Sequence, residues 1–348
     1  MEKRKINAEI VADSINEFGN RITTYLLTFP RFILPELNTH RLFTRNSASS
    51  RAIPFNKMVE MVETDPFIPI AWQKDHIGMQ GTEYITGDAE IRVREGWMLA
   101  SMDAVFNAKT LHNEDHLTKQ LCNRLLEPFM WHTVLVTATE YDNFFNLRCP
   151  KLYHEADGNT YNSVKDWNKV DSEIQWNNLA CLHPSNKSGA EIHIQALAEA
   201  MWKAQNESTP VLLKADEWHI PFSDQIDINE LHNFGIVECD NLYDVDELKL
   251  CIATARCARL SYMTFDGVID YQKDIDMHDK LLLDRHGSPF EHCSRTMTEE
   301  EYYTYTKGQG TYIDSEGISL GYQYFPESAN GWCDNFRGFI SYRKLLGI

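Results

Sequence analysis

Several features that would assign the chain to a class at once are missing. Its 348 residues contain no run of 18 apolar residues, so we expect no membrane-spanning helix. The N-terminus has no apolar segment typical of a secretory signal. Internal repeats and low-complexity linkers are also lacking. The composition, 43% apolar and 11% aromatic, is enough to bury a sizeable core.

Cysteine is sparse and unpatterned. The eight cysteines never form a Cys-x-x-Cys pair, and their density is too low for a disulfide scaffold. We therefore expect free thiols in a reducing compartment, the cytoplasm. The spacing of His286, Glu291 and His292 fits neither His-Glu-x-x-His nor a zinc finger, so no metal site is expected.

Positive charge is scarce overall but concentrated in one place. With 33 basic and 51 acidic residues the formal net charge is −18, which argues against sequence-independent binding of duplex nucleic acid. Residues 37–59 are the exception, because they include no Asp or Glu and carry Arg41, Arg45, Arg51 and Lys57 among many hydroxyl and amide side chains. A local group of guanidinium and hydroxyl donors suits a small phosphorylated molecule.

The order of apolar residues predicts both strands and helices. Residues 22–29 are β-branched and aromatic and predict a strand. Residues 189–206 predict the clearest helix, and further helices are expected at 97–127, 245–258 and 272–285. Residues 150–188 predict a long excursion with little regular structure. The mixture favours an α+β fold, with a mixed or antiparallel sheet flanked by helices.

The segment His40-Arg41-x-x-Thr44-x-Asn46-x-x-Ser49-x-Arg51 carries a recognisable motif. It resembles the signature of flavin-dependent thymidylate synthases, Arg-His-Arg-x-x-Ser-x-Asn-Glu-x-Ser-x-Arg, and its spacing matches throughout. The strand at 22–29 also resembles the strand that precedes the signature in that family.

Further blocks resemble the same family. Asn143-Phe-Phe-Asn-Leu-Arg148 is similar to Asn-Phe-Leu-x-Leu-Arg, and Arg124-Leu-Leu-Glu-Pro128 to Arg-x-x-Leu-Pro. Ala190-Glu-Ile-His-Ile-Gln195 resembles the family's Ala-Gln-x-Glu-Ile-Arg helix. Residues 255–261 and 286–292 resemble its Ala-Arg-Val-Ser and Gly-His-x-Ser-Pro-Phe-Glu-His blocks.

The order of these blocks differs from the family. There the Ser-Pro-Phe-Glu-His block precedes the strand and signature, whereas here it lies near the C-terminus. The simplest interpretation is a circular permutation, cut between His292 and the strand at 22–29. We expect one domain over residues 1–348 with permuted strand order, and the segments 150–188 and 296–348 have no counterpart that can be aligned.

The resemblance implies C5 methylation of dUMP to dTMP. It further implies FAD as cofactor, methylenetetrahydrofolate and NADPH as co-substrates, and a homo-oligomer, with a tetramer expected. Arg148 would polarise the pyrimidine as the catalytic residue. The residues implied to bind substrate are Glu36, Thr39, Ser47, Ser49, Ser50, Arg51 and Arg124. Those implied to bind the cofactor are His40, Arg41, Asn46, Thr137, Thr139, Asn143, Ser261, His292 and Ser294.

Some positions depart from the family pattern and leave alternatives open. Thr39 and Ser47 replace an Arg and a Glu of the signature, and Glu36 stands where the family has a substrate-contacting Gln. Such changes allow a related pyrimidine C5-modifying enzyme, such as a dUMP or dCMP hydroxymethylase, or a nucleotide-binding relative without flavin chemistry. A nucleophilic role for Cys149 is a weaker alternative, because an adjacent Arg148 can lower a thiol pKa.

Overall fold

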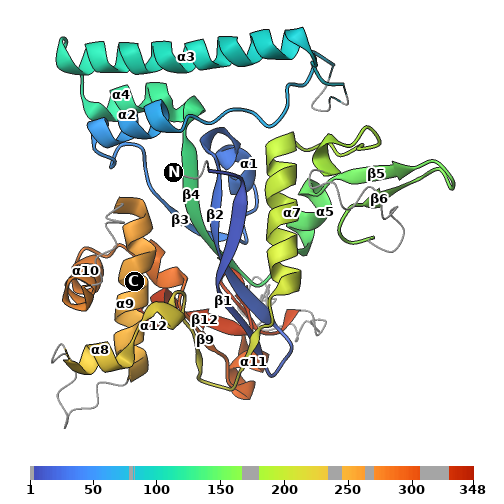
Figure 1. The fold of residues 1–348 in the computed structure, drawn as a ribbon. Helices are drawn as coiled ribbons and strands as arrows, with labels where there is room; N and C mark the ends of the chain where they lie inside the picture. The colour runs from blue at the N-terminus through green and yellow to red at the C-terminus, as the bar shows by residue number, and fades with distance from the viewer. Residues whose placement is uncertain are drawn as a thin grey trace, which may run out of the picture.

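A five-stranded mixed sheet is the centre of the fold (Figure 1). The computed structural model describes residues 4–77, 81, 83–166, 180–233, 245–262, 270–305 and 329–348. The strands, in sheet order, are β3 (Thr44–Ser47), β4 (Trp131–Ala138), β2 (Arg21–Pro30), β1 (Asn7–Asn16) and β7 (Val211–Leu213). Neighbours are antiparallel except β1 and β7, which are parallel. The expected mixed sheet is confirmed, and the permuted strand order stays a prediction.

The strand predicted at 22–29 lies within β2. It pairs with β1 on one edge and β4 on the other. Successive residues of β2, whose side chains point to opposite faces, are buried, so both faces are covered. Ile22, Tyr25 and Leu27 are fully buried, which accounts for the near-continuous apolar character of this segment. Gly19 has a φ of +77° in the turn from β1 to β2, a conformation that glycine adopts without strain.

Helices flank the sheet on several sides (Figure 1). They are α1 (Leu34–Asn38), α2 (Phe55–Thr64), α3 (Asp88–Asn113), α4 (Lys119–Leu126), α5 (Asp142–Arg148), α7 (Ile192–Glu207), α8 (Ile228–Asn233), α9 (Val245–Tyr262), α10 (Tyr271–Leu283), α11 (Glu299–Thr304) and α12 (Tyr342–Leu346). The helices predicted at 189–206, 245–258 and 272–285 correspond to α7, α9 and α10, and are confirmed.

The helical structure predicted at 97–127 is confirmed in part. The structure has two helices there, α3 and α4, separated by residues 114–118. The side chain of Thr118 accepts a hydrogen bond from the Gln120 amide and begins α4 as its N-cap. A capping hydroxyl at this point favours a new helix over continuation of the old one.

The expectation of little regular structure over 150–188 was also wrong in part. β5 (Lys151–His154) and β6 (Asn159–Asn162) form an antiparallel hairpin, and a short 3₁₀ helix follows at Ala180–Leu182. Gly158 takes a φ of +72° in the hairpin turn. Residues 167–179 of this segment lie outside the described residues.

A smaller sheet lies beside the first. Its order is β12 (Phe339–Ser341), β9 (Ser294–Thr296) and β8 (Trp218–His219), all antiparallel. The hairpin of β10 (Trp332–Cys333) and β11 (Phe336–Arg337) adjoins it in sequence. The 3₁₀ helix η6 (Ser288–Glu291) leads directly into β9. Part of the unaligned segment 296–348 therefore supplies regular strands.

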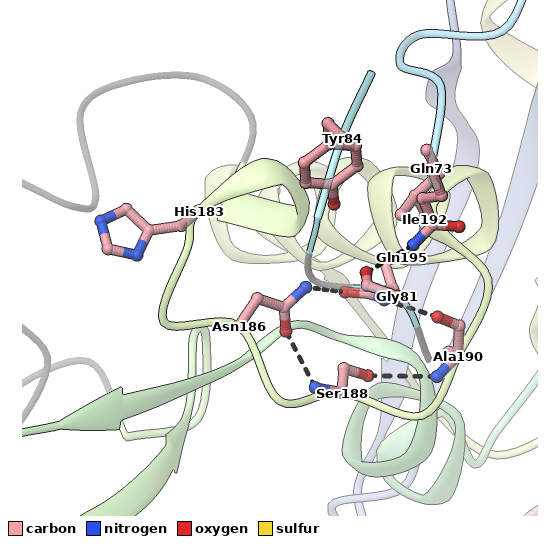
Figure 2. Close-up of a pocket in the computed structure, with 9 residues that line it drawn as sticks. All are labelled: Gln73, Gly81, Tyr84, His183, Asn186, Ser188, Ala190, Ile192 and Gln195. Carbon is pink, nitrogen blue, oxygen red and sulfur yellow. Dashed lines mark hydrogen bonds between the residues drawn. The ribbon is translucent and has the colours of Figure 1, made fainter. Parts of the chain in front are cut away.

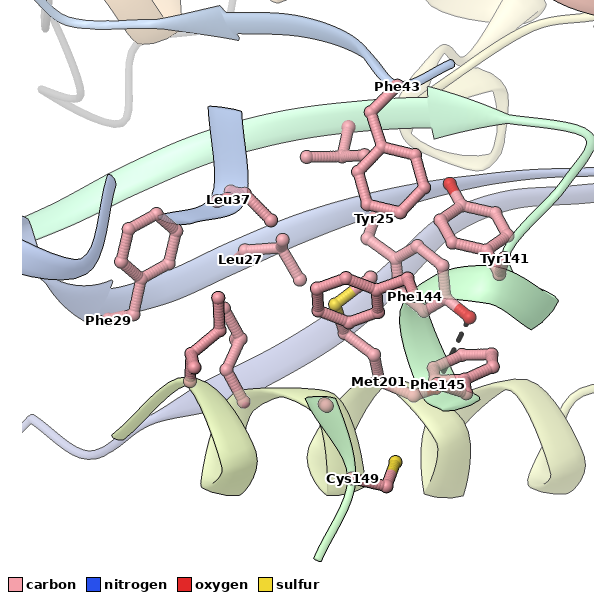
Figure 3. Close-up of a cluster of buried hydrophobic side chains, with 14 of the residues drawn as sticks. Tyr25, Leu27, Phe29, Leu37, Phe43, Tyr141, Phe144, Phe145, Cys149 and Met201 are labelled. Carbon is pink, nitrogen blue, oxygen red and sulfur yellow. Dashed lines mark hydrogen bonds between the residues drawn. The ribbon is translucent and has the colours of Figure 1, made fainter. Parts of the chain in front are cut away.

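The main core packs between the sheet and helices α5 and α7 (Figure 3). Tyr25 and Leu27 of β2 meet Phe144 of α5 and Met201 of α7, and the Tyr25 hydroxyl donates to the Met201 carbonyl at 3.2 Å. Burial of these aromatic rings fixes α5 against the sheet. The position of the last residue of α5, Arg148, follows from that packing.

Three further observations concern the chain as a whole. None of the helices in the described part is long and apolar enough to cross a membrane. The seven cysteines within the described ranges are unpaired. No group of three or more His, Cys, Asp or Glu side chains that could hold a metal ion is found among the described residues.

Candidate functional site

Arg148 is held by two residues of the signature motif. Its Nε donates to His40 Nε2 at 3.0 Å, and its NH2 donates to Thr39 Oγ1 at 3.0 Å. His40 is 8% exposed and lies edge-on to Phe144, so the apolar core fixes the ring that contacts the guanidinium. Residues of two sequence blocks about 108 positions apart thus meet in the structure.

The partners of Arg148 leave its charge uncompensated. Burial, with Arg148 and Arg45 nearby, lowers the pKa of His40 to about 4, so the imidazole is neutral at pH 7. Because Nε2 accepts from Arg148, the ring proton is on Nδ1. Within the described residues no carboxylate lies at ion-pair distance from Arg148. A fixed guanidinium without a counter-ion is suited to an electron-rich or anionic ligand.

Glu36 lies one helical turn before Thr39 and has an unsatisfied carboxylate oxygen. Thr39 Oγ1, which accepts from Arg148, donates to the Glu36 carbonyl at 2.7 Å. The Glu36 Oε2 atom is buried and has no hydrogen-bond partner among the described residues. An orphaned buried carboxylate oxygen is costly and calls for a donor. We call Glu36, Thr39, His40 and Arg148 the Arg148 cluster.

The predicted phosphate residues gather at a second place, the serine turn (residues 48–52). Asn123 Nδ2 of α4 donates to the carbonyl of Ser50 at 2.7 Å, which brings the neighbouring residues Arg51 and Arg124 to one turn. Arg51 and Arg124 are both exposed. The Ser50 hydroxyl donates to Glu127 and is therefore not free for a ligand. Ser49 Oγ lies 3.5 Å from Arg51 Nε.

Sequence reasoning missed residues that support the serine turn. Arg31 NH1 donates to the carbonyl of Ala48 at 3.2 Å and contacts the His132 ring, while its NH2 lies 3.5 Å from Glu127. Burial, with Arg31 alongside, lowers the pKa of His132 to about 3. No spacing in the sequence links Arg31 or His132 to the motif, so only the fold reveals them.

The Arg148 cluster and the serine turn lie at opposite ends of β3. Four residues of extended strand separate them, about 13 Å at 3.3 Å per residue. Ser47, predicted to bind substrate, is the last residue of β3 and half-buried.

Several predicted cofactor residues lie in the interior instead. Thr137 and His292 are fully buried, and Thr137 Oγ1 lies 2.8 Å from His292 Nδ1. Asn46 Nδ2 donates to the Cys257 carbonyl, and Ser294 Oγ is buried without a partner among the described residues. Thr137, His292 and Ser294 are fully enclosed in the described chain, and Asn46 is 9% exposed.

The remaining cofactor candidates are scattered. Arg41 and Asn143 are exposed; Arg41 follows His40 in sequence, and Asn143 precedes Phe144 on α5. The Thr139 hydroxyl accepts from the Arg337 amide at 3.0 Å. Ser261 is a residue of α9, and its side chain lies outside what the structure describes.

Thr137 and His292 form part of a longer hydrogen-bonded series, which we call the buried chain. Ser14 Oγ contacts His219 Nδ1 at 2.9 Å, and His219 Nε2 contacts Thr24 Oγ1 at 2.8 Å. Thr24 Oγ1 then contacts Thr137 Oγ1 at 2.8 Å, and Thr137 contacts His292. Burial lowers the pKa of both His219 and His292 to about 3. The series joins β1, β2 and β4 to the smaller sheet, and no sequence signal pointed to Ser14, Thr24 or His219.

Cys149 does not have the environment of a nucleophile. It is fully buried, and burial raises the pKa of its thiol far above the usual range. The adjacent Arg148 points to His40 and Thr39 rather than to the thiol. The possibility that Arg148 lowers this pKa was therefore wrong.

Two cavities lie outside the Arg148 cluster and the serine turn. One, of about 10 Å³, is lined by polar residues that include Asn186 and Gln195, whose amides are hydrogen-bonded at 2.8 Å (Figure 2). It has room for about one water molecule. The other, of about 340 Å³, lies between Thr44 and Glu291. Its acidic groups are matched by Arg343 and Lys344, so it has no excess charge to attract an ion.

Comparisons with known proteins give distant similarities only. No protein-family model matches the chain, and no curated protein matches its sequence. Among solved structures it is similar to the UMP/dUMP methylase PolB from Streptomyces cacaoi bound with 5-Br UMP, with 15% identity and a TM-score of 0.42 over 60% of this chain and 91% of that one. The PolB structure bound with 5-Br dUMP gives 13% identity and a TM-score of 0.42 over 60% and 92%. Values this low do not establish a shared fold.

Proposed function

We propose that the protein is an enzyme that methylates C5 of dUMP, using methylenetetrahydrofolate, FAD and NADPH. One observation carries the proposal: among the described residues no carboxylate lies at ion-pair distance from the Arg148 guanidinium, which is held by Thr39 and His40 of the signature motif. C5 of a uracil ring becomes nucleophilic when negative charge on the ring is stabilised. A fixed guanidinium beside the ring oxygens would supply that stabilisation.

The residues of the chain would divide the work. Neutral His40 and Thr39 would orient Arg148 against the pyrimidine, because each accepts one of its N–H groups. Arg51 and Arg124 at the serine turn would hold the phosphate through charge-assisted hydrogen bonds. The structure of the turn favours this role, since Asn123 fixes its backbone while both guanidinium groups stay exposed.

The described residues fit FAD only in part. Arg41 and Asn143 are exposed, are sequence neighbours of His40 and Phe144, and would offer a guanidinium and an amide to an anionic, aromatic cofactor. When bound, FAD would supply the one-carbon and hydride chemistry. Asn46, Thr137, His292 and Ser294 are engaged or enclosed in the interior, and in this arrangement they would act by supporting the fold around the site.

The contacts between blocks support a circular permutation. Asn46 of the signature donates to the carbonyl of Cys257, within the block 255–261. The Ser288 hydroxyl donates to the Arg45 carbonyl at 3.4 Å. Both C-terminal blocks therefore lie against β3, as they would in a chain whose blocks kept their spatial order while the ends moved.

The test is a product assay with a matched control. Purified protein would be given dUMP, the folate, FAD and NADPH, and the nucleotide product would be identified by mass spectrometry. Arg148→Lys keeps the charge but loses the fork that binds His40 and Thr39, so we expect kcat/KM to fall by about 10²–10³. Arg94→Lys, on the exposed surface of α3, should leave kcat/KM unchanged. Absence of dTMP together with absence of nucleotide binding would refute the proposal.

Glu36 favours a second candidate, modification of dCMP. A carboxylate accepts a hydrogen bond from the cytosine amino group, and the Glu36 Oε2 atom is buried without a partner in the described chain. On this candidate Glu36→Gln should lower kcat/KM for dCMP and raise it for dUMP. The same mass spectra distinguish methyl from hydroxymethyl products. Product from dUMP alone in both proteins would exclude the candidate, and nucleotide binding without any product would favour a binding protein.

A further inference from the structure

Arg31 is a half-buried arginine that joins the serine turn to the end of the main sheet. It directly follows the last residue of β2, and its backbone amide donates to the Met130 carbonyl at 3.0 Å. Its side chain is 16% exposed. The NH1 group donates to the Ala48 carbonyl at 3.2 Å and lies 3.1 Å from His132 Nδ1, while NH2 lies 3.5 Å from Glu127. The turn is therefore attached to the sheet through this one guanidinium.

The contacts of Arg31 belong to a set that holds the serine turn on both sides of Arg51. The Glu127 carboxylate accepts from the Ser50 hydroxyl and pairs with Arg31. Asn123 is fully buried, and its amide donates to the Ser50 carbonyl at 2.7 Å and to the carbonyl three residues later at 3.0 Å. The backbone of the turn is thus fixed before and after Arg51, whose own side chain stays exposed.

The serine turn gathers more positive than negative charge. Burial and the nearby charge of Arg124 lower the pKa of Arg31, so these two guanidinium groups are close enough to repel each other. Arg51 adds a third positive charge on the turn itself. Among the described residues Arg31 pairs with one carboxylate, that of Glu127, which cannot balance all three. A bound dianion, such as a phosphate monoester, would relieve this repulsion.

A purely structural anchor for the Ala48 carbonyl would not need a guanidinium. A neutral side chain can donate to a carbonyl, whereas burying a charge costs free energy unless the charge is closely paired. The pair between Arg31 and Glu127, at 3.5 Å, is longer than a charge-assisted hydrogen bond of about 2.7–2.9 Å. A half-buried charge with such weak compensation is best explained by an anionic ligand at the turn.

We propose that Arg31 is a positioning residue for the phosphate group of the substrate. Through Ala48 and Glu127 it keeps the serine turn in the shape that presents Ser49 and Arg51 to the phosphate, and its charge adds to the field that attracts this group. The inference rests on the proposed function, because dUMP supplies the phosphate. Arg31 lies outside the sequence blocks that carry the resemblance, so the resemblance does not imply this role.

Calorimetric binding of two ligands tests the proposal. dUMP and deoxyuridine differ by the phosphate alone, so a general disturbance of the fold weakens the binding of both. Arg31→Gln keeps a donor for the Ala48 carbonyl but loses the charge and the pair with Glu127. We expect its Kd for dUMP to rise by about 10–100-fold and its Kd for deoxyuridine to stay unchanged. Arg31→Lys, which keeps the charge, should recover part of the affinity for dUMP.

Arg21→Gln is the matched control. Arg21 is the first residue of β2, at the opposite end of the strand from Arg31. It likewise pairs with a carboxylate, that of Asp13, and donates to a backbone carbonyl, that of Gln205 at 2.8 Å. Its replacement should leave both Kd values unchanged, and circular dichroism would confirm that each variant is folded. Equal losses for dUMP and deoxyuridine in Arg31→Gln, or no loss for either, would overturn the proposal.

The experiment separates this inference from the proposed function. Binding is measured without folate or FAD, so an unchanged protein that binds dUMP but forms no dTMP would refute the methylation and still test Arg31. An unchanged protein that does not bind dUMP would overturn the role of Arg31 as well. In the product assay, Arg31→Gln should raise KM for dUMP with kcat unchanged, because the phosphate is held equally before and during the reaction.

Discussion

The buried chain predicts a specific loss of stability in mild acid. His219 and His292 are fully buried, and burial lowers both pKa values from 6.5 to about 3. Between these values the unfolded state binds more protons than the folded state, so the free energy of unfolding falls as the pH is lowered. From pH 7 to pH 5 the loss is about 2 kcal/mol for each histidine.

Other groups titrate in the same range, so the pH dependence of the free energy of unfolding of the unchanged protein alone does not identify the two histidines. Burial raises the pKa of Glu199 to about 7, which acts in the opposite direction, whereas His132 acts in the same direction as the buried chain. The decisive quantity is the difference between variants. His219→Gln and His292→Gln should each reduce the pH-dependent loss by about 2 kcal/mol, because glutamine keeps hydrogen bonding but does not titrate.

Urea unfolding followed by circular dichroism at pH 7, 6 and 5 measures this difference. His76→Gln is the control, because His76 is exposed, and its slope should match the unchanged protein. Slopes of the two buried-site variants that also match the unchanged protein would refute the assignment of neutral, hydrogen-bonded imidazoles to these positions.

Three further predictions concern single residues. Thr137→Val should lower the free energy of unfolding by about 1–3 kcal/mol, because Thr24 and His292 each lose a hydrogen-bond partner. Thermal unfolding measures this loss, and Thr133→Val on the same strand is the control that should have little effect. Cys149 should resist iodoacetamide in the folded protein and react once unfolded, as mass spectrometry would reveal; rapid labelling of the native thiol would contradict its burial. Arg124→Gln should weaken binding of dUMP by about 1.5–3 kcal/mol in calorimetry but leave deoxyuridine binding unchanged, and equal losses for both would argue against a phosphate contact.

Local sequence patterns predicted those parts of the structure that depend on neighbouring residues. The strand at 22–29 was predicted because its residues are β-branched and aromatic, and the helix at 189–206 because its apolar residues follow the helical period. The resemblance assigned Arg148 to the pyrimidine and His40 to the cofactor, and the hydrogen bond between the two side chains is seen only in the structure.

The features that sequence could not predict depend on distant residues or on a single side chain. The break between α3 and α4 includes His116 at a φ of +54° and the capping hydroxyl of Thr118, which are features of single residues. The buried chain requires segments more than 100 residues apart to meet, and isolated residues such as Ser14 and His219 carry no periodic signal. The commitment of Ser50 to Glu127 is likewise visible only once the helix carrying its partner is in place.

The buried chain also constrains when the protein can fold. Thr24 and Thr137 belong to the two central strands, which leave the ribosome early, yet their imidazole partners are His219 and His292. Until residue 292 has been synthesised, the sheet can be assembled only with part of its interior hydrogen bonding unmade. Because contacts of such high sequence separation form late, the N-terminal strands must wait for nearly the whole chain before they are fully stable.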